Sequence, residues 1–148
     1  MANKPILIPN GIGFGDETLS KYDEGTWAVS WTATSGTAPS IGNGSLSGNY
    51  TRVGRQVTAT IKLQIGSTTV TGSAGFWRFS VPFTAAVTGT GSVAINDAGT
   101  RYFHAVLEFS DLNNVIGLIP GTAEVVSYLK PMTWASTDSF VASFSYFI

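Results

Sequence analysis

A strict alternation of apolar and polar residues over residues 56–65, QVTATIKLQI, constrains the fold of this chain more than any other feature. Its apolar members are Val57, Ala59, Ile61, Leu63 and Ile65. This pattern is typical of a half-buried β-strand, because successive side chains of a strand point to opposite faces. Similar runs recur between clusters of Gly, Ser, Asn and Thr, and helical periodicity is nearly absent. The sequence therefore predicts an all-β fold.

The spacing of these runs predicts one antiparallel β-sandwich, of jelly-roll or related Greek-key type. Strands are predicted over residues 26–34, 47–53, 56–65, 76–81, 91–96, 101–109, 114–119, 124–130 and 140–148. Gly54 in VGRQ separates two strand-like runs, which indicates a tight hairpin at a position that tolerates positive φ. The segment NDAGTR, residues 96–101, indicates a second such hairpin.

The chain has the length of a single domain, 148 residues. We divide it into an extended N-terminal arm, residues 1–25, and a β-sandwich, residues 26–148. Charged residues make up 11% of the chain and the formal net charge is −1, so no basic stripe for nucleic acid is expected. Because there is no cysteine, neither a disulfide framework nor a thiolate metal site is expected.

The first 20 residues contain no signal-peptide core, because the apolar run Ile6-Leu7-Ile8 ends at Pro9. No stretch approaches the roughly 18 consecutive apolar residues of a membrane span. We therefore expect a protein made in the cytoplasm, without a membrane partner.

The proposed arm combines prolines and glycines with apolar side chains and has no sustained alternation. Its apolar candidates for anchoring are Ile6, Leu7, Ile8, Ile12 and Phe14. Two interpretations remain open: the arm adds to a neighbouring molecule, or it wraps over its own core.

The last strand, FVASFSYFI, is apolar on both of its faces. Phe140, Phe144 and Tyr146 alternate on one face, whereas Val141 and Phe147 lie on the other. Such a strand is either central in a sandwich or packed against another subunit. Under the second interpretation, the candidate oligomer interface is Phe140, Phe144, Tyr146 and Ile148.

No residue pattern indicates catalysis, a cofactor or a metal. His104 is the only histidine and has no cysteine or second histidine to complete a zinc site. Glu108 and Asp111 could form a glycosidase pair, but they straddle a predicted strand end, where acidic residues are common. We interpret all three as structural or surface residues and expect no enzyme activity.

The four tryptophans divide into two pairs. Trp27 and Trp31 are an even number of residues apart in one predicted strand and are expected to pack in the core. Trp77 and Trp134 stand at the edges of their runs, so they are the candidates for an outward surface that stacks against sugars.

Three motifs in fixed order resemble a β-module of bacteriophage virion proteins. They are YDEGTW at residues 22–27, GNYTRVGRQVTATIKLQI at residues 48–65 and FSVPF at residues 79–83. Proteins with this module include tail-fibre, head-fibre and capsid-surface proteins. The resemblance ends at residue 83, and the remainder of the chain matches nothing in the module.

The resemblance implies a virion surface protein that is a homotrimer. The module begins close to Met1, which favours a short appendage over a long fibre. We therefore expect a capsid decoration or cement protein, held by its arm to the major capsid protein or to another virion protein. The alternative is a tail-fibre or tail-tip protein that binds host surface polysaccharide as a receptor.

Overall fold

A computed structural model describes residues 12–14, 17–19 and 21–148. The strands are β1 (Ile12–Phe14), β2 (Glu17–Leu19), β3 (Tyr22–Trp27), β4 (Trp31–Ser35), β5 (Ser45–Val53), β6 (Gln56–Gln64), β7 (Ala74–Ser80), β8 (Val87–Asp97), β9 (Arg101–Asp111), β10 (Asn114–Leu118) and β11 (Ser139–Phe147). No helix occurs among these residues. The predicted all-β antiparallel sandwich is confirmed.

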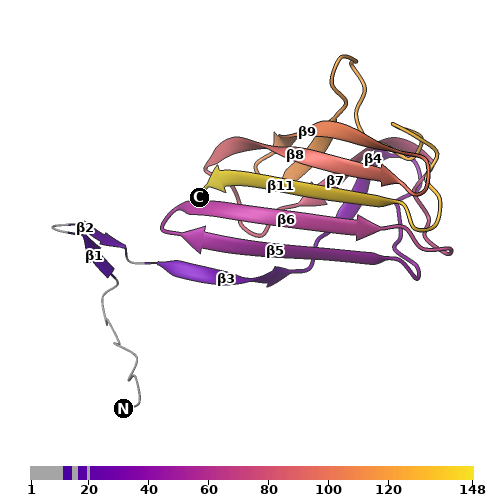
Figure 1. Cartoon of the computed structure of the whole chain (residues 1–148). Coiled ribbons are helices and arrows are strands. Elements are labelled where there is room, and N and C mark those ends of the chain that lie inside the picture. Colours follow the sequence, from indigo (N-terminus) through magenta and orange to yellow (C-terminus); the bar gives the residue numbers. More distant parts are fainter. Residues whose placement is uncertain (1–11, 15–16, 20) are drawn as a thin grey trace, which may run out of the picture.

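The sandwich is formed by one nine-stranded sheet that curls on itself (Figure 1). Its strand order is β3-β5-β6-β11-β8-β9-β10-β7-β4, and β1 pairs only with β2. The curl brings the end of β3 and the residues that follow it against β7 at Ser80. There Trp27 Nε1 donates to the Ser80 carbonyl at 3.2 Å, and the Ser30 N–H donates to Ser80 Oγ at 2.8 Å.

The curl places the inner faces of both halves around one core. Phe79 of β7 stacks on Phe140 of β11, with ring centroids 4.8 Å apart, and Trp31 of β4 meets Trp77 edge-on at 4.8 Å. The alternating residues of β6 form the floor of this core, and all of them are buried. Aromatic pairs of this kind stabilise a core beyond the effect of buried area alone.

The chain from residue 22 to residue 35 differs from the prediction. The expected strand over residues 26–34 is two strands, because residues 28–30 cross from one edge of the sheet to the other. Trp27 and Trp31 therefore do not share one strand, although Trp31 is buried in the core as expected. Because β3 begins at Tyr22, the sheet starts inside the predicted arm of residues 1–25.

The strand predicted over residues 124–130 is wrong. This segment belongs to a protruding loop that makes only isolated bridges, such as Leu118↔Val125 and Ser127↔Lys130 (Figure 1). The Lys130 ammonium pairs with Glu124 at 2.7 Å across the loop. Within residues 124–130 only Val126 is fully buried in the core, so the segment has no buried face of the kind a strand would have.

Both predicted hairpins are confirmed. Gly54 has φ 60° between β5 and β6, and Gly99 has φ 80° between β8 and β9. A left-handed conformation at each turn is accessible to glycine at no steric cost.

Two of the three sequence motifs are direct partners in the sheet. The motif of residues 22–27 is β3, and it pairs antiparallel with the β5 part of the second motif. Each motif supplies a glycine that faces an aromatic ring of the other: Gly25 is opposite Tyr50, and Gly48 is opposite Trp27. A Cβ at Gly48 would lie 2.6 Å from atoms of the Trp27 ring. The spacing of the motifs therefore encodes a reciprocal aromatic–glycine pairing.

Candidate functional site

The two tryptophans predicted to face outward are in the core. Trp77 is 1% exposed and Trp134 is 9% exposed, and their rings pack with centroids 4.6 Å apart. Their indole N–H groups donate to the carbonyls of Thr71 and Ser127 at 3.0 and 2.8 Å. The prediction of an outward surface at Trp77 and Trp134 is wrong, because Trp77 lies on the inner face of β7 and the segment before β11 folds Trp134 against it.

The predicted oligomer interface also points inward. β11 lies between β6 and β8, and its side chains Phe140, Phe144 and Tyr146 are buried among those of the same chain. Ile148 is half-buried, and its N–H donates to the Arg55 carbonyl at 2.9 Å. The interpretation of a central strand is therefore confirmed, and these residues are not an exposed interface.

The anchoring residues divide between two regions. Ile6, Leu7 and Ile8 lie outside the described residues. Ile12 and Phe14 are the ends of β1, which pairs with β2. Anchoring through these five residues stays a prediction.

The acidic residues and the histidine do not converge. His104 and Glu108 are exposed on the outer face of β9. Asp111 forms an ion pair with Arg78 and accepts hydrogen bonds from the Asn114 amide at 3.0 Å and from the Asn113 N–H at 2.8 Å. Desolvation raises the pKa of Asp111, but these hydrogen bonds and the Arg78 charge hold it below its usual value. A general acid needs the opposite shift.

The outer face of the sheet instead carries an ordered set of cross-strand rows. At one end, Tyr22, Val53, Gln56, Phe147 and Val87 are direct neighbours on β3, β5, β6, β11 and β8. All five side chains are exposed, so they lie on the outer face. We call the four apolar members, Tyr22, Val53, Phe147 and Val87, the apolar row. It lies at the end of the sheet where β3 begins and β11 ends (Figure 1).

The middle of the same outer face is covered by small polar side chains. The next two rows across β5, β6, β11 and β8 are Thr51, Thr58, Ser145 and Thr90, and then Asn49, Thr60, Ser143 and Ser92. Thr58 and Ser145 are joined across the strands by a hydrogen bond of 3.1 Å. On these four strands the two rows carry hydroxyl and amide groups in place of charges.

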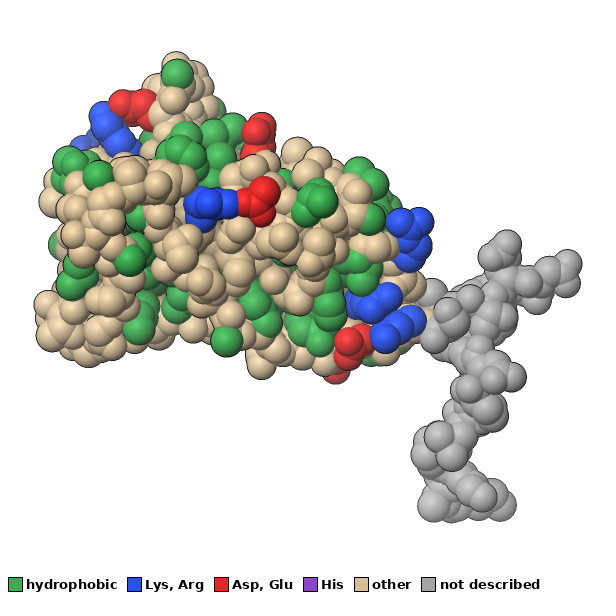
Figure 2. Space-filling model, turned by 180° about the vertical axis from the view of Figure 1, so that it is seen from behind, with side chains coloured by type: hydrophobic (Ala, Val, Ile, Leu, Met, Phe, Trp, Pro, Cys, Tyr) green, Lys and Arg blue, Asp and Glu red, His purple; other side chains and the backbone are tan. Residues whose placement is uncertain are grey.

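Charged side chains are also sparse on the opposite side of the molecule. Figure 2 shows this side, which includes β4 and β7, with basic and acidic groups scattered among polar and apolar ones. An interface on such a surface would form without the desolvation of many charges.

The far end of the outer face holds a second row, which we call the distal row. Ser45, Gln64, Ser139, Asn96 and Tyr102 are direct neighbours on β5, β6, β11, β8 and β9. Tyr102 is 72% exposed, the largest exposed fraction among the large apolar and aromatic side chains of the described residues. The distal row is therefore polar along most of its length and ends in an exposed aromatic ring.

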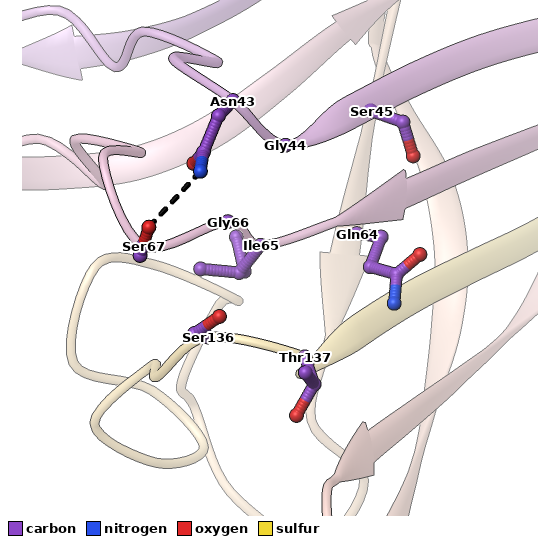
Figure 3. Close-up of a pocket in the computed structure, with 9 residues that line it drawn as sticks. All are labelled: Asn43, Gly44, Ser45, Gln64, Ile65, Gly66, Ser67, Ser136 and Thr137. Atoms are coloured by element: carbon purple, nitrogen blue, oxygen red, sulfur yellow. Dashed lines mark hydrogen bonds between the residues drawn. The ribbon is translucent and has the colours of Figure 1, made fainter.

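A hollow of about 400 Å³ opens beside the distal row. Three segments line it: residues 43–45, residues 64–67, and Ser136 and Thr137 before β11 (Figure 3). The wall at Asn43 is fixed, because its amide group donates to Ser67 at 3.0 Å and accepts from the N–H of Thr68 at 2.9 Å. No lining residue is charged.

A buried carboxylate holds the third segment in place. Asp138 is 2% exposed and accepts hydrogen bonds from the N–H groups of Ala98 and Ala135 at 2.9 and 2.7 Å. Its neighbour Thr137 has φ 79°, a left-handed conformation that is a steric outlier for a β-branched residue. Strain of this kind persists where surrounding contacts enforce it, often at functional sites.

Protein-family models, curated proteins and solved structures were compared with this chain. None of them matches it. Within the described part of the chain, no helix is long and apolar enough to cross a membrane, and no group of three or more His, Cys, Asp or Glu side chains could hold a metal ion.

Sequence reasoning missed both rows. A signal for the distal row is present in the sequence, because Tyr102 alternates with the polar residues His104 and Glu108, and this pattern is typical of an outward face. The apolar row had no such signal, because its members become neighbours only when the strands are paired in register.

Proposed function

We propose that this chain is a bacteriophage virion structural protein, a trimeric capsid decoration or cement protein on the virion surface. The N-terminal residues 1–20 and the apolar row together attach it to the major capsid protein or to another virion protein. The proposal is supported by the order of the three motifs and by the position of the apolar row at the end of the sheet where β3 begins.

The apolar row is the observation that carries this proposal. Exposed apolar side chains scattered singly need no explanation, but two neighbouring pairs, Tyr22–Val53 and Phe147–Val87, separated by the Gln56 side chain of β6, form a surface that gains from being covered. Burying such a side chain completely contributes about 1.5–3 kcal/mol, and these are already partly buried. The row therefore supplies about 3–6 kcal/mol per subunit before the cost of association, which is itself about 4–15 kcal/mol, so one row alone does not hold a subunit in place.

Attachment of that strength requires additional contacts. A trimer presents three rows at once, and the apolar arm adds a second contact from each chain. Linked weak contacts raise the overall affinity by about 10²–10⁴-fold when the geometry allows them to bind together. A decoration protein with many copies on a regular shell meets this condition.

Two changes test the attachment. Deletion of residues 1–20 and the Phe147→Thr variant should each leave a folded body that joins the virion poorly, measured by quantitative immunoblotting of purified particles. The Tyr102→Ala variant is the matched control, because Tyr102 lies at the opposite end of the sheet. Full incorporation of both altered proteins would reject the proposal.

A tail-associated protein that binds host polysaccharide is the second candidate function. The distal row, with its exposed Tyr102, is the observation that favours it. Immunogold electron microscopy separates the two candidates: label distributed over the whole capsid supports decoration, and label confined to the tail supports receptor binding.

A further inference from the structure

We propose that the distal row and its hollow bind an extended chain of neutral sugars. One sugar ring occupies the hollow at Gln64, and another stacks on Tyr102. This inference goes beyond attachment to the virion and does not depend on where the protein is located.

The chemistry of the hollow selects a neutral, hydroxyl-bearing ligand. Apart from the apolar side chain of Ile65, its lining groups are hydroxyls, amides and backbone atoms, and no charged side chain is present to attract an ion. Ser45, Gln64 and Thr137 make no side-chain hydrogen bond to other described residues, so their donors and acceptors are available. Sugar hydroxyls both donate and accept hydrogen bonds, and they match such a set of groups.

The rigidity of the hollow supports a built site. Asn43, Ser67 and Thr68 fix one wall, and the Asp138 carboxylate holds the other. Thr137 lies in the second wall in a strained left-handed conformation, and the Thr137 N–H donates to the Ile65 carbonyl at 2.8 Å. A preorganised site lowers the entropic cost of binding a flexible chain.

Tyr102 provides the second contact, independent of the hollow. It is separated from Gln64 by three strand spacings, about 14 Å at about 4.8 Å per strand. Ser139 and Asn96 bridge this span on the same face. The ligand must therefore be an oligosaccharide or longer, because a monosaccharide cannot reach both contacts.

Affinity electrophoresis tests this proposal with the full-length protein. Native gels containing dextran, mannan or a galactan should retard the wild-type protein in at least one case. The Tyr102→Ala and Gln64→Ala variants should bind that polysaccharide at least about fivefold more weakly, because loss of an aromatic contact or of paired hydrogen bonds costs about 1 kcal/mol or more. The corresponding free monosaccharide should compete poorly.

A matched control comes from the other end of the same face. Tyr22 is 63% exposed, so Tyr22→Ala removes a comparable ring and should not change retardation. Denaturation midpoints of all variants establish that they are folded. The proposal is overturned if none of the three polysaccharides retards the wild-type protein, or if Tyr22→Ala weakens binding as much as Tyr102→Ala does.

These outcomes are separable from those of the proposed function. A protein that joins the capsid through residues 1–20 but is not retarded by any neutral polysaccharide would refute the sugar site alone. A protein that binds polysaccharide but is absent from virions would refute the decoration role alone.

Discussion

Replacement of Asp138 by alanine should destabilise the protein more than any change on its surface. The carboxylate is 2% exposed and accepts two backbone hydrogen bonds, from Ala98 at 2.9 Å and Ala135 at 2.7 Å. A hydrogen bond to a charged group contributes about 1.5–3 kcal/mol, so the loss of both has a range of about 3–6 kcal/mol. Because the two N–H groups are only part-buried, water can partly replace the carboxylate. We therefore expect a loss of about 3 kcal/mol.

Urea denaturation monitored by tryptophan fluorescence measures this loss as a lower midpoint with an unchanged slope. Asp138→Asn should have an intermediate effect, because one oxygen remains an acceptor while the new NH₂ group faces a backbone donor. Glu108→Ala, an exposed acidic residue on β9, is the control and should change stability by about 0.5 kcal/mol or less. A loss below about 1 kcal/mol for Asp138→Ala would show that the carboxylate does not hold this end together.

Three further predictions concern other sites. Burial raises the pKa of Tyr146 to about 12, above its ordinary value of 10.0, and the Phe83 N–H donates to its hydroxyl at 3.2 Å. Its neutral form therefore stabilises the fold fully below pH 10, and we expect about 2–3 kcal/mol of stability to be lost between pH 10 and 12. The Tyr146→Phe variant should lack this part of the fall in unfolding free energy with pH in alkaline denaturation. An identical pH dependence in the two proteins would contradict the assignment. Phe147→Thr should leave both the oligomeric state in sedimentation velocity and the denaturation midpoint nearly unchanged, because the ring is 51% exposed on the row proposed to face the virion; a large fall in the midpoint would mean that the ring belongs to the core. Thr137→Gly should stabilise the isolated protein by up to about 1 kcal/mol by relieving the left-handed strain, and a net loss of stability would show that the threonine side chain is needed for folding.

The inner face of the sheet could be predicted from the sequence because it depends on local alternation. The pattern in β6 places Val57 and Ile61 on one apolar face, which is buried in the core. For β11 the pattern leaves open whether Phe140 and Phe144 face the core or another subunit, and the structure buries them in the core. In each case the period of two is a property of the strand itself. The local pattern therefore predicts most of the strands and their apolar faces, but neither what covers the apolar face of β11 nor the loop at residues 124–130.

The crossing at residues 28–30 could not be predicted in this way. Trp27, Val29 and Trp31 continue the alternation through the crossing, yet the first belongs to β3 and the last to β4, at opposite edges of the sheet. The choice between one strand and two depends on which distant strands offer free edges, β5 for one segment and β7 for the other. This information lies in the pairing of strands and not in the local pattern.

The apolar row could not be predicted from the sequence either, because its members become neighbours only through the register of strand pairing. Val53, Phe147 and Val87 come from distant parts of the chain and meet only because of the pairings of β5, β6, β11 and β8. The surface positions predicted for Trp77 and Trp134 are wrong because they rested on neighbours in the sequence alone. Their neighbours Gly75 and Pro131 indicate loops, but Trp77 belongs to the inner face of β7, and the segment that carries Trp134 folds over that face.

The two ends of the outer face should act independently, because the apolar row is proposed to attach the protein to the virion and the distal row to bind polysaccharide. Val53 and Ser45 mark the two ends of β5, which are about 26 Å apart at about 3.3 Å per residue. Sites so far apart, with no shared partner, have additive free energies. Phe147→Thr should therefore lower virion incorporation to the same extent with or without Tyr102→Ala. Tyr102→Ala should likewise weaken polysaccharide binding to the same extent in both backgrounds. A double variant that departs from additivity by more than about 0.5 kcal/mol would show that both ends contribute to one interface, and a single extended contact along the sheet would then replace the two proposed here.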